Sequence, residues 1–169
     1  SWQLISIYES LCEMGSPFGL RDFGGQAFNS MRLEKMYRAY GAEFTEEISA
    51  LEAGMDRFLD LSRNFIGSDN IKERQSKGVE TQLAYLIFDD EIPAECFGNE
   101  AVFDGEELSG IITSGAYGYR VGHSVAFAYL NPRHCNEGKA LRVETSLGSR
   151  KCHVSMNAAY DNDNEKLRS

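Results

Sequence analysis

Residues 19–54 read GLRDFGGQAFNSMRLEKMYRAYGAEFTEEISALEAG, and this stretch decides how the rest of the chain is interpreted. It opens with a glycine-rich loop, where the backbone can adopt positive φ or approach a ligand closely. Apolar residues then recur at steps of four, which predicts a helical run that ends at a turn near Gly41. Arginine, glutamate and aromatic residues interrupt the pattern, and such mixed stretches are where functional sites are expected.

Arg32 lies inside this helical run and not on its polar rim. An arginine on a largely apolar face must find an anion, because an unpaired buried guanidinium is very costly. Two anions are considered: an internal carboxylate, Glu34 or Glu52, or an acidic ligand. The residues alone favour the internal ion pair. Tyr40 is equally ambiguous, since its ring suits both stacking on a ligand and packing in a core with the hydroxyl at the surface.

Three motifs follow one another in this stretch: NSMRLEK at residues 29–35, YG at 40–41 and LEAG at 51–54. In this order they resemble the aminomethyltransferase family, that is, the glycine-cleavage T-protein and its relatives. The versions found here, together with RDFG at 21–24, most resemble the folate-binding part of dimethylglycine and sarcosine dehydrogenases. Family members carry a long folate-binding segment upstream, so the resemblance implies that this chain corresponds to the C-terminal part of a larger protein.

The resemblance implies tetrahydrofolate as the cofactor and assigns four residues to its binding. Arg32 is expected to bind the carboxylates of the folate tail, because a planar guanidinium suits that task. Tyr40 is expected to contact the ring system, and Glu34 to fix Arg32 and nearby backbone amides. Arg120, in the glycine-rich stretch 115–122, is a second candidate for an anion contact, although the residues alone favour a solvated loop arginine.

The implied function is capture of a one-carbon unit released from an N-methylated amine such as dimethylglycine or sarcosine, which gives 5,10-methylenetetrahydrofolate. The sequence contains no GxGxxG motif opening a βαβ unit, so FAD is expected only on a separate domain or chain. Catalytic residues remain unassigned, because the family's acidic residue lies in the upstream segment. Expected partners are therefore that segment and a flavoprotein domain or subunit. Two alternatives stay open: a non-catalytic assembly part of a larger complex, and a folate-dependent demethylase relative.

Composition excludes several classes of function. The formal net charge is −9 over 169 residues, which argues against a nucleic-acid partner. No apolar run is long enough to span a membrane, and the first residues lack the pattern of a signal peptide. The cysteines are widely spaced and the histidines lack metal-ligand spacing, so free thiols, no metal site and a reducing compartment, cytoplasm or mitochondrial matrix, are expected.

The predicted fold class is α+β: the C-terminal part of a folate-binding domain over residues 1–77, then a small antiparallel β-barrel over 78–169. Short runs of strand-forming residues, separated by turn signals, predict the barrel. The predicted helices and strands are 7–14, 69–75, 83–88, 101–103, 107–112, 124–130, 141–146 and 151–155. Residues 2–5 read as the end of a strand, Thr45 as a helix start, 51–61 as a helix or strand, and Gly115–Gly122 as a loop.

Overall fold

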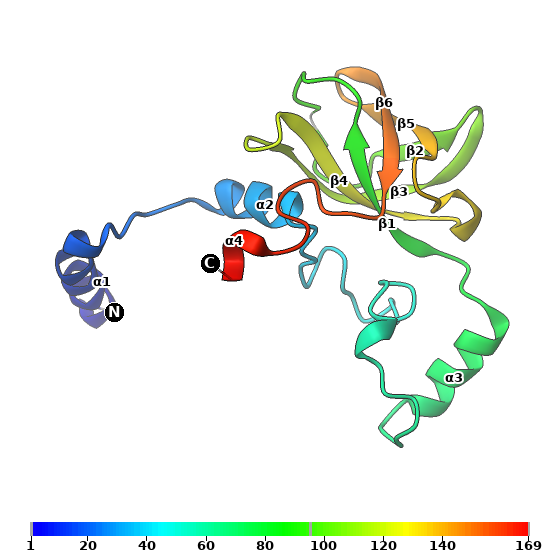
Figure 1. The fold of residues 1–169 in the computed structure, drawn as a ribbon, viewed down its shortest axis with the longest axis horizontal. Helices are drawn as coiled ribbons and strands as arrows, with labels where there is room; N and C mark the ends of the chain where they lie inside the picture. Colours follow the sequence, from blue (N-terminus) through cyan, green and yellow to red (C-terminus); the bar gives the residue numbers. More distant parts are fainter. Residues whose placement is uncertain (1, 95, 169) are drawn as a thin grey trace.

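A closed antiparallel barrel of six strands forms the main body of the molecule in the computed structural model, which describes residues 2–94 and 96–168 (Figure 1). The strand order is β1-β4-β3-β2-β5-β6, and β6 pairs back with β1. The strands are β1 (Gln82–Phe88), β2 (Ala101–Asp104), β3 (Glu107–Gly118), β4 (His123–Leu130), β5 (Ala140–Thr145) and β6 (Gly148–Ser155). The predicted α+β class and barrel are confirmed.

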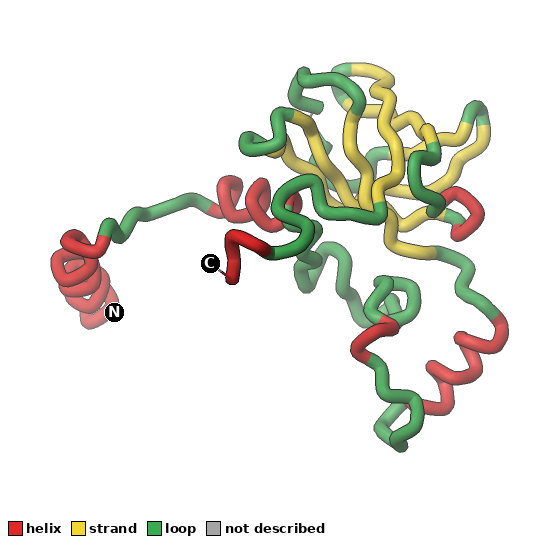
Figure 2. Tube along the Cα trace, viewed as in Figure 1, coloured by secondary structure: helices red, strands yellow, loops and turns green. Residues whose placement is uncertain are grey.

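The helices lie outside the barrel (Figure 2). They are α1 (Trp2–Gly15), α2 (Gly25–Glu34), α3 (Ser68–Lys77) and α4 (Glu165–Arg168), with 3-10 turns at Ser16–Phe18, Asp56–Phe58 and Pro132–His134. Helix α2 lies against the barrel, whereas α1 stands away from it at the end of an extended segment and has no buried residue. Among the described residues, no helix is both long and apolar enough to cross a bilayer.

Strand β1 is buried on both faces, as its apolar run predicts. Alternate residues Ala84, Leu86 and Phe88 join the core inside the barrel. Leu83 and Tyr85 face outward and pack with Leu33 of α2. The Tyr85 hydroxyl donates a hydrogen bond to the Leu33 carbonyl over 2.8 Å, so the polar group on the outward face of β1 is hydrogen-bonded to the end of α2. Helix α2 is thereby fixed to the barrel wall.

The prediction of a glycine-rich loop over residues 115–122 is wrong for the first half of that stretch, because Gly115 and Gly118 belong to β3. Strand glycines of this kind mark close approach of another segment. A Cβ atom on Gly115 would lie 2.5 Å from the Cys96 carbonyl oxygen. Gly122, with φ of 78°, is the residue that makes the turn into β4.

Some of the predicted helices are confirmed and others are wrong. Helices 7–14 and 69–75 are confirmed as parts of α1 and α3, but residues 2–5 belong to α1 and not to a strand. Helix α2 ends at Glu34, before the predicted Gly41, because Met36 has φ of 57°. Residues 45–61 contain turns and one 3-10 segment in place of the helix start expected at Thr45 and the helix or strand expected over 51–61. The division of the chain at residue 77 stays a prediction.

Contacts of Glu52 and the conformation of Gly54 explain why residues 45–61 form no extended helix. The Glu52 carboxylate accepts hydrogen bonds from the Ser49 N–H and hydroxyl and from the Arg74 guanidinium of α3. Gly54 then adopts φ of 63°, which ends any helical course. The Ser49–Glu52 pair therefore caps one short turn, in which the Ala53 N–H donates to the Ser49 carbonyl, and the chain does not continue as a helix.

Candidate functional site

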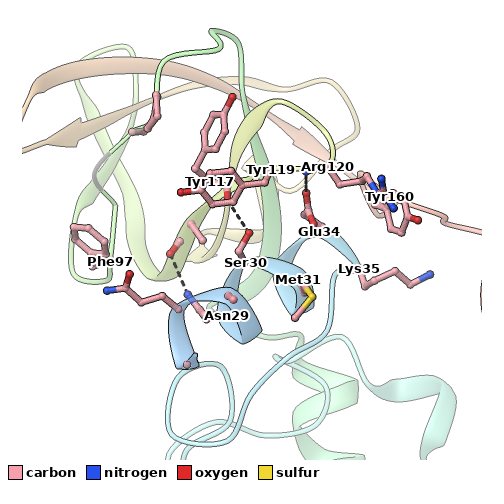
Figure 3. Close-up of a pocket in the computed structure, with 17 residues that line it drawn as sticks. Asn29, Ser30, Met31, Glu34, Lys35, Phe97, Tyr117, Tyr119, Arg120 and Tyr160 are labelled. Carbon is pink, nitrogen blue, oxygen red and sulfur yellow. Dashed lines mark hydrogen bonds between the residues drawn. The ribbon is translucent and has the colours of Figure 1, made fainter. Parts of the chain in front are cut away.

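A cavity of about 1100 Å³ lies between α2 and the barrel (Figure 3). Its walls come from α2, the segment before β2, the C-terminal half of β3 and the segment after β6. The lining residues are Gly25, Gln26, Ala27, Asn29, Ser30, Met31, Glu34, Lys35, Pro93, Ala94, Phe97, Gly115, Ala116, Tyr117, Tyr119, Arg120 and Tyr160. The volume suits a cofactor-sized ligand, and most of the wall is apolar or aromatic.

Two hydrogen bonds hold α2 at the edge of this cavity. The Ser30 hydroxyl donates to the Tyr117 carbonyl over 2.7 Å, and the Asn29 amide donates to the Gly115 carbonyl over 3.3 Å. Both acceptors belong to β3. The glycine at position 118 leaves room for this approach, because a Cβ atom there would lie 3.0 Å from the Glu34 side chain, so the sequence of the strand helps to set the position of the helix.

Glu34 connects the end of α2 to the β3–β4 turn. Its side chain is buried, and its Oε1 atom accepts hydrogen bonds from the backbone N–H groups of Arg120, at 2.6 Å, and Val121, at 3.2 Å (Figure 3). Charge-assisted bonds of this type are stronger than neutral ones. Glu34 therefore fixes the turn that carries Arg120, in the amide-fixing role that the sequence predicted for it.

The mouth of the cavity is aromatic and positively charged. The Arg120 guanidinium lies over the Tyr160 ring, 5.6 Å from its centroid, and Tyr119 packs edge-on against Tyr117 at 5.2 Å. The ammonium of Lys166, which is hydrogen-bonded to the Tyr160 hydroxyl, and the nearby Arg120 lower the pKa of Tyr160. Among the described residues, no carboxylate lies within ion-pair distance of Arg120. Its charge is thus available to an anionic ligand.

Arg32 is buried and forms an internal ion pair. One guanidinium nitrogen lies 2.9 Å from the Glu43 carboxylate and also donates to the Tyr37 carbonyl, while Nε donates to the Asn29 side chain over 2.9 Å. The partner is neither Glu34 nor Glu52, the two carboxylates considered from the sequence. Arg32 does not line the cavity, but it holds Asn29, which does. Its contact with a folate carboxylate stays a prediction.

Tyr40 is 80% exposed and lies outside both α2 and the cavity wall. Its backbone forms an isolated bridge with Phe44. Of the four residues that the resemblance assigned to cofactor binding, Glu34 and Arg120 therefore meet at one cavity, whereas Arg32 and Tyr40 lie outside it.

Glu43 is the residue that the sequence analysis missed. It is completely buried, and its two oxygens accept hydrogen bonds from Arg32, the Ala39 N–H, and the hydroxyls of Thr113 and Ser114. The sequence could have indicated this buried carboxylate, because Glu43 stands between the apolar residues Ala42 and Phe44, where a solvated carboxylate is not expected.

Tyr160, in the C-terminal tail, was also missed. The tail is attached to the end of α2. The Tyr160 N–H donates to the Glu34 carbonyl over 3.0 Å, and Lys35 forms an ion pair with Asp161 at 3.0 Å. These contacts join residues far apart in sequence, so no local pattern could have indicated them.

The four cysteines are free thiols, as expected. Burial raises the pKa of Cys135 to about 11 and that of Cys152 to about 12, so neither is a ready nucleophile. Within residues 2–94 and 96–168 no cluster of histidine, cysteine and acidic side chains is arranged to hold a metal ion.

Comparison with known families matches almost all of this architecture. Residues 1–63 match the GCVT N-terminal domain, and residues 82–161 match the glycine cleavage T-protein C-terminal barrel domain. The chain belongs to the glycine cleavage T-protein family. The resemblance inferred from the motifs of residues 19–54 is thereby confirmed.

Relatives in this family are considerably longer than the chain. Human mitochondrial dimethylglycine dehydrogenase is 34% identical over 143 residues, which cover 83% of this chain and 16% of that protein. The aminomethyltransferase of Corynebacterium aurimucosum is 32% identical over 126 residues, 74% of this chain and 34% of the relative. The structure of aminomethyltransferase T from Bartonella henselae superposes with a TM-score of 0.72 at 21% identity, covering 80% of this chain and 38% of that one, and supports the fold.

Proposed function

We propose that this member of the glycine cleavage T-protein family is the tetrahydrofolate-binding part of a one-carbon transfer module. The observation that carries the proposal is the cavity between α2 and the barrel, in which Glu34 fixes the turn that presents Arg120. The resemblance to the family implies a cofactor-binding role for both residues. The dimethylglycine dehydrogenase relative supports an N-methylated amine, such as dimethylglycine or sarcosine, as the source of the one-carbon unit.

The residues that line the cavity suit the chemical parts of a folate. Tyr117, Tyr119 and Tyr160 offer flat surfaces for a ring system, and Arg120 offers a guanidinium for a carboxylate. Tetrahydrofolate would supply the amine nitrogens that take up the one-carbon unit as 5,10-methylenetetrahydrofolate. The contribution of this chain would be to hold the cofactor in position and to exclude water from it, which raises the effective concentration of the reacting groups.

Arg32 and Tyr40 enter the proposal in different ways. Arg32 would act indirectly, by holding the Asn29 side chain, whose amide also bonds to β3 at the cavity wall. Direct contact of Arg32 with the folate would require the ion pair with Glu43 to open. Tyr40, being exposed, would contact the folate from outside the cavity described above.

The remaining parts of the reaction would lie on other segments or chains. We propose that the exposed apolar surface of α1, which includes Trp2, Leu4 and Met14, packs against the rest of a folate-binding domain. A flavin that oxidises the amine would be carried by a separate domain or subunit. The mitochondrial relative and the free cysteines support a mitochondrial matrix or cytoplasmic location.

Calorimetric titration of the chain with tetrahydrofolate tests the proposal. We expect saturable binding that Arg120→Gln weakens at least tenfold, because a charge-assisted hydrogen bond contributes about 1.5–3 kcal/mol and about 1.4 kcal/mol corresponds to a factor of ten. The matched control is Arg133→Gln, since Arg133 is an exposed arginine paired with Glu107 and does not line the cavity. Equal affinities for wild type and Arg120→Gln would remove Arg120 from the site.

A non-catalytic role in assembly is the second candidate. The observation that favours it is the complete internal pairing of the Glu43 carboxylate, which already engages Arg32, the residue that the family motif assigns to the cofactor. Absence of any heat with tetrahydrofolate would favour this role. A folate-dependent demethylase relative is distinguished by absorbance spectroscopy of the purified full-length protein, because only the dehydrogenase would carry a flavin.

A further inference from the structure

A second cavity, of about 580 Å³, lies between the segment that follows α2, the turn at residues 54–58 and the segment after β6. It is lined by Lys35, Met36, Tyr37, Arg38, Phe44, Gly54, Met55, Arg57, Phe58, Met156, Ala158, Asn162 and Asn164. It shares only Lys35 with the first cavity, and none of the four residues that the resemblance assigned to the cofactor lines it.

The charge of this lining is opposite to the charge of the chain. The whole sequence has 26 acidic and 17 basic residues, yet three basic residues and no acidic residue line the cavity. Lys35 is already neutralised by Asp161. In the described part of the chain, no carboxylate lies within ion-pair distance of Arg38 or Arg57. Two guanidinium charges therefore remain without a partner.

Arg38 is the less accessible of the two. Its Nε atom is buried and has no hydrogen-bond partner within the described residues. Burial, and then the neighbouring charge of Arg57, lower the pKa of Arg38. The Glu43 carboxylate is near enough to act on Arg38, but its oxygens are already engaged by Arg32 and three other donors. A buried donor without a partner is costly, so an arrangement of this kind indicates a missing acceptor.

Arg38 makes two further contacts, with Phe127 and with Gly54. Its guanidinium carbon lies 5.8 Å from the centre of the Phe127 ring, which covers one face only. Gly54, at φ of 63°, approaches one terminal nitrogen, and a Cβ atom there would lie 3.3 Å from it. Because this position carries no side chain, it leaves space beside that terminal nitrogen.

The rest of the wall is apolar. Met36, Met55 and Met156 line the cavity, and the Arg57 guanidinium carbon lies 4.6 Å from the centre of the Phe58 ring. Methionine side chains are adaptable and pack against apolar ligands of many shapes. A free inorganic anion would leave these walls unused, whereas an anion attached to an apolar group would use both features.

We propose that this cavity is a binding site for a small organic carboxylate with an apolar body, held by the guanidinium groups of Arg38 and Arg57. Arginine is suited to this role because its planar fork matches the two oxygens of a carboxylate. The site is independent of the proposed folate cavity, since only Lys35 lines both.

The test compares three probes by calorimetry and by two-dimensional NMR of the labelled chain. These are 4-phenylbutyrate, its neutral amide 4-phenylbutyramide, and inorganic phosphate. We expect 4-phenylbutyrate to bind at least tenfold more tightly than the other two, with shifts at residues that line the second cavity. Equal binding of the acid and the amide would overturn the anion site, and preference for phosphate would overturn the organic carboxylate.

Substitutions of the two arginines distinguish a role in ligand binding from a role in stabilising the fold. Arg57→Gln changes an exposed side chain and should weaken 4-phenylbutyrate at least tenfold without changing the fold. Arg63→Gln is the matched control, because Arg63 is an exposed arginine paired with Asp60 outside the cavity. Arg38→Met should abolish binding and leave the melting temperature equal or higher, since an unpartnered guanidinium is removed. A lowered melting temperature with unchanged affinity would make Arg38 a structural residue and contradict the proposal.

Discussion

Replacing Glu43 by alanine is expected to lower the free energy of unfolding by about 3–5 kcal/mol, the cost of leaving one member of a buried ion pair alone. The substitution removes the carboxylate that pairs with Arg32 and also removes the acceptor of the Thr113 and Ser114 hydroxyls of β3. Urea unfolding followed by far-ultraviolet circular dichroism measures the change. Tryptophan fluorescence is unsuitable, because the single tryptophan, Trp2, lies in α1 away from the barrel.

The control is Glu46→Ala, which removes an exposed carboxylate from the same segment and should change stability by less than about 0.5 kcal/mol. The double variant Arg32→Met, Glu43→Leu should recover much of the loss, because an apolar pair can replace a buried ion pair without large cost. If Glu43→Ala is as stable as wild type, the ion pair is not a structural element. If the double variant folds and still binds tetrahydrofolate normally, Arg32 does not bind the cofactor.

Replacing Gly110 by alanine is expected to destabilise the barrel by about 3 kcal/mol or more, beyond the usual range for a small-to-large change. Gly110 of β3 pairs with Leu130 of β4, and a Cβ atom would lie 1.9 Å from the Tyr129 carbonyl oxygen and 2.9 Å from the Leu130 Cα atom. Both are backbone atoms, so neither can move without disturbing the β3–β4 ladder. Thermal unfolding followed by circular dichroism measures the effect.

Gly24→Ala is the matched control for this substitution. A Cβ atom on Gly24 meets no atom within 4 Å, and its φ of −85° is one that alanine adopts readily. We expect its melting temperature to lie close to that of wild type, since the restriction of the unfolded chain by alanine is offset by its poorer N-cap propensity at the start of α2. A Gly110→Ala melting temperature within experimental error of the control would show that the two strands separate easily at this position.

The barrel could be predicted from sequence because its signals are local. The apolar run of β1 and the Asp104-Gly105 turn between β2 and β3 each depend on a few neighbouring residues. The stretch from 45 to 61 was misread for the opposite reason. Its course depends on Glu52 bonding to Arg74, 22 positions away, and periodicity carries no information about such a contact.

The candidate site could be predicted only in part, because some of its residues belong to recognisable sequence patterns and others reach it through contacts between distant segments. Glu34 and Arg120 were identified because the family motif and a glycine-rich stretch flag them, and they lie 86 positions apart yet join at one cavity. The partner of Arg32 was missed because Glu43 follows the turn at Gly41, and the direction of the chain after a turn cannot be inferred from spacing. Tyr160 reaches the cavity only because the tail returns to α2.

Closure of the barrel has a consequence for how the protein is made. Strand β1 is hydrogen-bonded to β4 on one edge and to β6 on the other. β1 is the first strand of the barrel to be synthesised and β6 the last, so one edge of β1 stays unpaired until β6 has left the ribosome. Pairing between such distant segments is slow, and until then the unsatisfied edges of β1 and β5 can recruit other chains. A nascent chain stalled before Gly148 would hold both edges open, and would therefore depend on chaperones more than the finished protein does.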